Sequence, residues 1–243
     1  MMTYEAFAVL YDELMYDQPY DKWLELTVPY LNGKQSILDL ACGTGSFTAL
    51  LPKQLDRVGV DLSEDMLTVA QTKDPSIQWL VQDMTALELD MTFDVITCFC
   101  DSMNYVTTEE DLNKLFSHVY MHLEEDGVFL FDVHSVWKMT NLFDGQTYSD
   151  ETEHVTYLWQ TEPGEEENSV YHDMSFFTLE EDGRYRRFDE SHYQRTFPLE
   201  FYIELLETNQ FTVEKVFADF NTDRPIEEDA ERIFYVARKK CKR

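Results

Sequence analysis

The stretch that decides the fold is Ile37-Leu38-Asp39-Leu40-Ala41-Cys42-Gly43-Thr44-Gly45-Ser46. It is an apolar run that carries one carboxylate, followed by two glycines and then by a segment that is able to start a helix. This order predicts a strand, a tight turn and a helix, which together bring a backbone close to a nucleotide-like ligand at the end of a parallel strand. Glycine suits such a turn because a Cβ would obstruct either a positive φ or the approaching ligand.

Strand-like and helix-like segments alternate on the C-terminal side of this stretch. Short apolar runs with helical patterns between them predict a mostly parallel sheet with helices on both faces. We therefore expect an α/β fold with a Rossmann-like, doubly wound, seven-stranded sheet. The predicted strands are residues 36–40, 57–60, 77–81, 93–99, 127–132, 212–220 and 232–238, and the predicted helices after Gly45 include residues 64–71, 109–123 and 199–209.

The rest of the chain divides around this core. Residues 1–35 are rich in aromatic side chains at helical spacing and predict an N-terminal helical flap, with its second helix at about residues 21–31. Residues 36–134 and 198–243 form the predicted core. Residues 135–197 show alternating patterns at 151–160, 169–179 and 185–197, which predict an inserted antiparallel β lid. This insertion is expected to serve either the substrate or dimerisation, and the sequence favours neither.

Composition narrows the classes of partner. The chain has 243 residues, 44% of them hydrophobic, and a formal net charge of -29. A field of this sign repels polyphosphates and anionic membranes, so nucleic acid is a disfavoured partner without being excluded. The N-terminus has no secretion-signal pattern, and no apolar run approaches the roughly 20 residues that span a bilayer. The four cysteines (Cys42, Cys98, Cys100 and Cys241) show neither CxxC pairs nor zinc spacing, so we expect reduced thiols in a cytoplasmic protein that holds no metal.

Four polar features follow successive predicted strands, at the edge where open α/β sheets bind their ligands. They are the glycine loop after Asp39, Asp61, the segment Gln82-Asp83-Met84, and residues 98–105. A carboxylate such as Asp61 can accept both hydroxyls of a ribose. Each feature also has a structural alternative, such as a helix cap or a turn. It is their occurrence in order, each after a strand, that indicates a ligand site.

The glycine loop departs from the dinucleotide-binding pattern. That pattern has a third glycine, and Thr48 stands at the matching position here. Asp39 precedes the loop, and a carboxylate suits a cationic amine better than a diphosphate because of its charge. The loop therefore favours an adenosine ligand that carries an amino group and no phosphates.

These segments together resemble the class I S-adenosylmethionine-dependent methyltransferases, in particular the small-molecule N-methyltransferase-like subgroup. Residues 38–45 resemble the first motif, residues 59–67 with Ala70 the second, residues 82–84 the third, and residues 93–105 the fourth. Residues 123–129 resemble the turn and strand that end the conserved half. The resemblance covers roughly residues 36–133, and Ala41 departs from it where many members carry glycine.

The resemblance implies S-adenosyl-L-methionine as cofactor and S-adenosyl-L-homocysteine as its product. It implies that Asp61 holds the ribose, that the glycine loop holds the methionine part, and that residues after the third strand hold the adenine. Two tyrosines would close over the methionine carboxylate. The complete set of expected cofactor-binding residues is Tyr11, Tyr20, Asp39, Ala41, Gly43, Gly45, Asp61, Leu62, Met66, Gln82, Asp83, Met84, Cys98 and Phe99.

Methyl transfer from a sulfonium is an in-line displacement, so alignment of the acceptor and exclusion of water matter most. The expected catalytic residues are Asn104, Tyr105 and His134, with Asp101, Ser102 and Trp137 as further candidates near the acceptor; a general base is optional. We expect a small-molecule acceptor with a nitrogen or oxygen nucleophile and a possible homodimer. An RNA-modifying methyltransferase, a nicotinamide-dependent oxidoreductase and a non-catalytic cofactor-binding protein remain alternatives.

Overall fold

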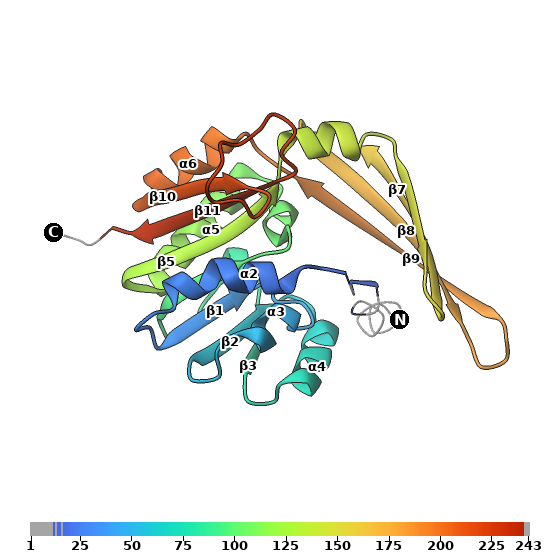
Figure 1. Ribbon diagram of the computed structural model, residues 1–243, viewed down its shortest axis with the longest axis horizontal. Helices are drawn as coiled ribbons and strands as arrows, with labels where there is room; N and C mark the ends of the chain where they lie inside the picture. Colours follow the sequence, from blue (N-terminus) through green and yellow to red (C-terminus); the bar gives the residue numbers. More distant parts are fainter. Residues whose placement is uncertain (1–11, 13, 16, 241–243) are drawn as a thin grey trace.

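The computed structural model describes residues 12, 14, 15 and 17–240. Its main sheet has seven strands in the order β10-β11-β5-β4-β1-β2-β3 (Figure 1). Strands β1 to β5 run parallel to one another, and β11 is antiparallel to both of its neighbours, β5 and β10. The predicted mostly parallel α/β sheet is confirmed. The strands are β1 (Ser36–Leu40), β2 (Asp56–Asp61), β3 (Gln78–Val81), β4 (Phe93–Cys98), β5 (Leu123–His134), β10 (Phe211–Ala218) and β11 (Arg232–Lys239).

Helices cover both faces of this sheet (Figure 1). Strand residues alternate between the faces, so Ile37 packs with Trp23 on one side while Leu38 packs with Phe116 on the other. One face carries α2 (Tyr20–Thr27) and α3 (Ser46–Leu50), and the opposite face carries α5 (Glu109–His122) and α6 (Leu199–Thr208). The helix α4 (Glu64–Lys73) follows β2, and the short helices are η1 (Val28–Tyr30), η2 (Met84–Ala86), η3 (Ser102–Tyr105) and η4 (Lys138–Leu142).

A second sheet lies to one side of the core as a long antiparallel ribbon (Figure 1). Its strands are β6 (Thr147–Glu151), β7 (Val155–Pro163), β8 (Ser169–Leu179) and β9 (Tyr185–Arg195), in that order. The strand predicted at residues 151–160 was wrong at its start. The hydroxyl of Thr152 accepts hydrogen bonds from the backbone N–H groups of His154 and Val155, which makes a turn between β6 and β7.

The second sheet has two different faces. Its inner face packs Val155, Phe176 and Phe188 together with Leu14 and with Met66 of α4. At the end nearer the core, Val170 packs with Met139 and Phe143. The inner face therefore contacts the rest of the molecule at both ends. Outer-face residues include the ring pair Tyr171 and Tyr193.

Several predicted boundaries moved. The helix predicted at residues 21–31 divides into α2 and η1, and Pro29 in η1 explains the break because a proline cannot donate an interior helical hydrogen bond. Strand β5 covers Leu123–His134, so it begins four residues before and ends two residues after the strand predicted at residues 127–132. Within the described residues, no helix is long and apolar enough to cross a membrane.

Candidate active site

The glycine loop has left-handed backbone at Ala41, Gly43 and Gly45, with φ values of 53°, 54° and 73°. A Cβ added to Gly43 would meet nothing within 4 Å, so this residue leaves an open surface. A Cβ on Gly45 would lie 2.4 Å from the ring of Trp79. Gly45 is thus required by its backbone and by the packing of Trp79. Ala41 adopts the strained conformation in spite of its Cβ, at a cost of roughly 1–2 kcal/mol.

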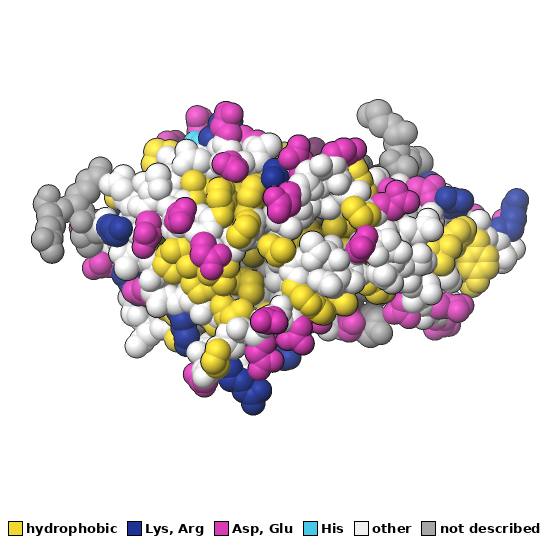
Figure 2. Space-filling model, turned by 90° about the horizontal axis from the view of Figure 1, so that it is seen from above, with side chains coloured by type: hydrophobic (Ala, Val, Ile, Leu, Met, Phe, Trp, Pro, Cys, Tyr) yellow, Lys and Arg dark blue, Asp and Glu magenta, His cyan; other side chains and the backbone are white. Residues whose placement is uncertain are grey.

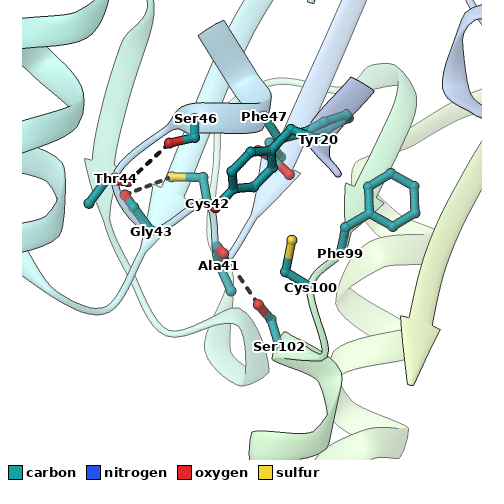
Figure 3. Close-up of a pocket in the computed structure, with 11 residues that line it drawn as sticks. Tyr20, Ala41, Cys42, Gly43, Thr44, Ser46, Phe47, Phe99, Cys100 and Ser102 are labelled. Atoms are coloured by element: carbon teal, nitrogen blue, oxygen red, sulfur yellow. Dashed lines mark hydrogen bonds between the residues drawn. The ribbon is translucent and has the colours of Figure 1, made fainter. Parts of the chain in front are cut away.

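A pocket lies between this loop and the residues that follow β4 (Figure 3). The ring of Tyr20 extends from α2 over the loop, opposite Cys100 and Ser102. The Ser102 hydroxyl donates to the Ala41 carbonyl at 3.4 Å, which joins the two walls. Burial raises the pKa of the Tyr20 hydroxyl, so Tyr20 keeps its proton and can act as a donor.

Asp61 ends β2 beside the same loop. Its carboxylate accepts hydrogen bonds from the backbone N–H of Gly43 at 2.8 Å and from that of Ser63 at 2.9 Å. These contacts fix the orientation of both oxygens, and each retains acceptor capacity because a carboxylate has about four lone-pair sites. Burial raises the pKa of Asp61. The arrangement suits a ligand that offers two adjacent hydroxyls.

Asp39 has a different role from a simple ligand partner. The side chain lies at the base of the pocket and Asp39 is only 3% exposed. Its oxygens accept hydrogen bonds from the hydroxyls of Thr48 at 2.5 Å and Thr97 at 2.9 Å. Burial raises the pKa of Asp39 to about 7. Thr48, which occupies the position of the missing third glycine, therefore holds the carboxylate that precedes the loop.

The expected adenine-side residues lie along the adjoining strand ends. Leu62 is 71% exposed, and Asp83 caps η2 by accepting from Thr85 N at 2.8 Å. The side-chain amide of Gln82 forms two hydrogen bonds with the backbone of Glu88: it donates to the carbonyl at 2.9 Å and accepts from the N–H at 3.0 Å. Met84 packs against the core, and Met66 packs against the second sheet.

Cys98 does not line the pocket. It is fully buried in the core, and Phe99 and Cys100 form the wall instead. Burial raises the pKa of the Cys42, Cys98 and Cys100 thiols, which disfavours reactive thiolates. Tyr11 lies outside the described residues. Among the residues the structure describes, no group of His, Cys, Asp and Glu side chains is arranged to hold a metal ion.

A buried charge network lies at the ends of β4, β5 and β11. Arg232 donates to Asp132 at 2.7 Å and to Asp101 at 3.0 Å. Asp132 also accepts from the Trp23 indole at 2.6 Å and from the Asp101 backbone N–H at 2.8 Å. Burial acts to raise the pKa of Asp101, but His134 and Arg232 outweigh it and hold that pKa well below its usual range. Asp101 is therefore a fixed anion.

His134 faces this anion. Its Nε2 lies 3.5 Å from Oδ2 of Asp101, and its buried Nδ1 has no hydrogen-bond partner among the described residues. Burial lowers the pKa of His134, while the charge of Asp101 opposes that shift. The ring is neutral at neutral pH, since its pKa lies below the ordinary value of about 6.5. It can therefore accept a proton beside a carboxylate that would stabilise the cation.

Of the other two expected catalytic residues, one contacts His134 and the other contacts the second sheet. Asn104 is fully buried; its side chain accepts from the His134 backbone N–H at 2.9 Å and donates to the Arg195 carbonyl at 2.9 Å. Asn104 thus positions His134. Tyr105 places its hydroxyl 3.5 Å from Nδ1 of His192 on β9.

The second sheet also reaches the charge network. Gln194 on β9 donates to Oδ2 of Asp101 at 2.9 Å. Trp159 on β7 donates to Nδ1 of His172 on β8 at 3.1 Å, and burial lowers the pKa of His172 to about 4. Four residues of this network, Trp23, Asp132, Gln194 and Arg232, were not expected from the sequence to have a role in the site. Asp132 was recognisable as a strand-end carboxylate. Arg232 was not, because only the antiparallel direction of β11 brings its first residue to this edge.

Comparisons with known proteins agree with this geometry. The family described as Methyltransferase domain matches residues 37–127. YqeM of Bacillus subtilis (strain 168), which is assigned as a methyltransferase, is 44% identical over 98% of this chain and 98% of its own length. A crystal structure of an S-adenosylmethionine-dependent methyltransferase from Clostridium acetobutylicum is 32% identical, with a TM-score of 0.86 over 97% of this chain and 98% of that one.

A further relative matches only part of the chain. The dTDP-3-amino-3,4,6-trideoxy-alpha-D-glucopyranose N,N-dimethyltransferase of Streptomyces venezuelae is 34% identical over 116 residues, which are 47% of this chain and 48% of its own.

Proposed function

Because the chain belongs to the class I S-adenosylmethionine-dependent methyltransferases, we propose that it methylates the amino nitrogen of a small molecule. The enzyme class and the cofactor follow from the family. The acceptor, its nitrogen nucleophile and the roles of individual residues are our proposal.

The pocket fits S-adenosylmethionine. Gly43 offers a surface without a Cβ, Asp61 offers two oriented acceptor oxygens for the ribose, and Tyr20 offers a hydroxyl donor toward the methionine end. When bound, the cofactor supplies a methyl group on a sulfonium and leaves as S-adenosylhomocysteine. The conformation of the loop would be maintained by Gly45, Ala41 and Asp39. The adenine would be bordered by Leu62, Asp83 and Met84.

The observation that carries the nitrogen acceptor is the pair of Asp101 and His134. An alkylamine is an ammonium ion at neutral pH and must lose a proton before its nitrogen is nucleophilic. The fixed anion Asp101 attracts the ammonium group, and the neutral His134 beside it accepts its proton. Asp101 then stabilises the imidazolium, as a carboxylate does for histidine in other general-base pairs. Asn104 keeps the histidine in place.

The distribution of charge favours a small acceptor over RNA. Acidic side chains are spread along the face seen in Figure 2. Three of the four arginines in residues 135–197 also pair with carboxylates: Arg184 with Asp182 at 2.5 Å, Arg187 with Asp189 at 2.8 Å, and Arg195 with Glu166 at 3.7 Å. Paired arginines contribute little to counterion release on a nucleic acid. The partial relative that methylates an amino sugar supports an amine acceptor.

We further propose that residues 135–197, and so the second sheet, serve as a lid over the acceptor. The contacts of its inner face with Leu14, Met66 and Asp101 support this role. Residues 1–35 would complete the enclosure as a flap, and residues 36–134 with 198–243 would form the catalytic core. Dimerisation stays a prediction.

The test is formation of S-adenosylhomocysteine by the purified protein with panels of amines and of matched alcohols. We expect turnover with amines and none with alcohols. Bulk tRNA in the same assay should give neither turnover nor a salt-dependent increase in S-adenosylhomocysteine. Turnover with tRNA alone, or with alcohols alone, would refute the proposal.

A further inference from the structure

Glu190 is a largely buried acidic residue in the middle of the inner face of the second sheet. Alternation along β9 places it on the same side as Phe188, His192 and Gln194. Glu190 is 8% exposed, although most of the acidic residues of this chain lie at the surface. Glutamate is seldom buried to this extent unless it is paired.

Glu190 has no such pair. No hydrogen bond or ion pair joins its carboxylate to any residue that the structure describes. Burial raises its pKa, and no neighbouring cation opposes that shift. Neither oxygen of this carboxylate is among the fully buried side-chain atoms that lack a partner, so the group stays open to solvent and can accept a partner from outside the chain.

The neighbours of Glu190 place it toward the proposed acceptor. Two residues before Glu190 along β9, Phe188 belongs to the cluster that packs on Leu14 and Met66. Two residues after Glu190 along the strand, His192 packs edge-to-face with Tyr105 at a centroid distance of 5.8 Å. Glu190 thus lies between two points where the second sheet touches the cofactor-binding half of the molecule.

Two separate negative centres lie near the proposed acceptor. Asp101, Asp132 and Arg232 together carry a formal charge of -1, because the one guanidinium is shared by two carboxylates. Glu190 adds a second negative centre. It lies four residues along β9 from Gln194, which contacts Asp101, and four strand residues span about 13 Å.

We propose that Glu190 anchors a second cationic group of the acceptor, so that the substrate is a diamine or longer polyamine rather than a monoamine. The proposal rests on the proposed amine methylation: one nitrogen reacts beside His134 while the far nitrogen pairs with Glu190. The separation of the two negative centres requires an acceptor on the order of 10 Å long. Two negative centres also disfavour an acceptor that carries a diphosphate.

The test compares three acceptors of one length: 1,8-diaminooctane, 1-aminooctane and 8-amino-1-octanol. In the wild-type enzyme, kcat/KM for the diamine should exceed that for each of the other two by roughly 30-fold or more, the range for a desolvated charge pair. Glu190→Gln should abolish this preference while changing kcat/KM for 1-aminooctane less than about 3-fold. Asp173→Asn is the matched control, because Asp173 is an exposed carboxylate on the outer face of the adjoining strand β8.

Unchanged diamine preference in Glu190→Gln, or equal loss with the amino alcohol and the diamine, would overturn the proposal. Calorimetric binding of 1,8-diaminooctane in the presence of S-adenosylhomocysteine tests the Glu190 anchor independently of the proposed methyl transfer. If no amine is methylated but Glu190→Gln still weakens diamine binding about 30-fold, the anchor stands and the proposed chemistry fails. If the wild-type protein binds the diamine no better than 1-aminooctane, the anchor fails.

The melting temperature distinguishes an anchoring role of Glu190 from a structural one. A carboxyl whose pKa is raised on folding stabilises the protein at low pH, and this contribution is lost as the pH rises through the folded-state pKa. Glu190→Gln should therefore melt at the same or a higher temperature than the wild type at pH 8. A clearly lower melting temperature would assign Glu190 a structural role and contradict the anchor.

Discussion

Gln194 on the second sheet and Asp101 at the end of β4 share a hydrogen bond, with Nε2 of Gln194 2.9 Å from Oδ2 of Asp101. The same oxygen faces Nε2 of His134 at 3.5 Å, while Oδ1 accepts from Arg232 at 3.0 Å. The second sheet thus contacts the carboxylate that orients the proposed base. The position of this sheet and the geometry of that base are therefore physically linked.

The Asp101–His134 pair predicts a particular pH dependence. The base must be neutral, and burial keeps its pKa below the ordinary value, so kcat/KM for an amine should fall only as the pH drops below about 6.5. His134→Gln should lower kcat by about 100-fold or more and remove this acid limb, with cofactor affinity unchanged. Steady-state pH profiles measure both effects. An unaltered acid limb in His134→Gln would assign the titration to another group.

Asp61 should control cofactor affinity. Asp61→Ala removes the two oxygens proposed to hold the ribose, and each charge-assisted hydrogen bond contributes about 1.5–3 kcal/mol. The Kd for S-adenosylmethionine should rise by roughly 100-fold or more in calorimetric titrations. Asp90→Ala, at an exposed carboxylate, is the control and should leave Kd unchanged. Similar Kd values for wild type and Asp61→Ala would contradict the assignment of the ribose site.

The two loop glycines should respond differently to alanine. Gly43→Ala adds a Cβ to open space and incurs only the left-handed backbone cost, roughly 1 kcal/mol, but should weaken cofactor binding. Gly45→Ala also drives its Cβ into Trp79 and should lower the free energy of unfolding by about 2–4 kcal/mol. Urea denaturation and calorimetry separate the two effects. Equal losses of stability would show that Trp79 yields to the new methyl group.

Arg232 should stabilise the fold. Arg232→Met leaves Asp132 and Asp101 without their shared cation, and breaking a buried pair in this way costs about 3–5 kcal/mol of unfolding free energy. The double variant Arg232→Met with Asp132→Asn should recover part of that loss. Arg184→Met provides the control: the Arg184–Asp182 pair is exposed and should contribute at most about 1 kcal/mol. Equal effects at Arg232 and Arg184 would mean that the buried network adds no stability.

Much of the core was predictable from sequence because local patterns determine it. The bounds of β1 and β8 were predicted to the residue, since both are strand-forming runs delimited by polar turns. The turn between β6 and β7 was missed because it depends on one threonine hydroxyl, in a segment whose composition still favours strand.

The site was predictable only where its residues follow strands directly. Asp61 and the glycine loop meet as expected because parallel strands bring their carboxyl ends to one edge. Arg232, Gln194 and Glu190 come from an antiparallel strand and an insertion, so their position depends on pairing register and not on local sequence. Cys98 was misassigned to the pocket wall because a one-residue shift along a strand exchanges the pocket face for the core face.

The most direct test of the account is to follow a ¹³C-labelled methyl group from S-adenosylmethionine to its acceptor. With 1,8-diaminooctane, NMR of the product should show the label bonded to nitrogen, and His134→Gln should form this product at least about 100-fold more slowly. A label bonded to oxygen in a hydroxyl-bearing acceptor, with no labelled amine from any of the amines tested, would contradict it.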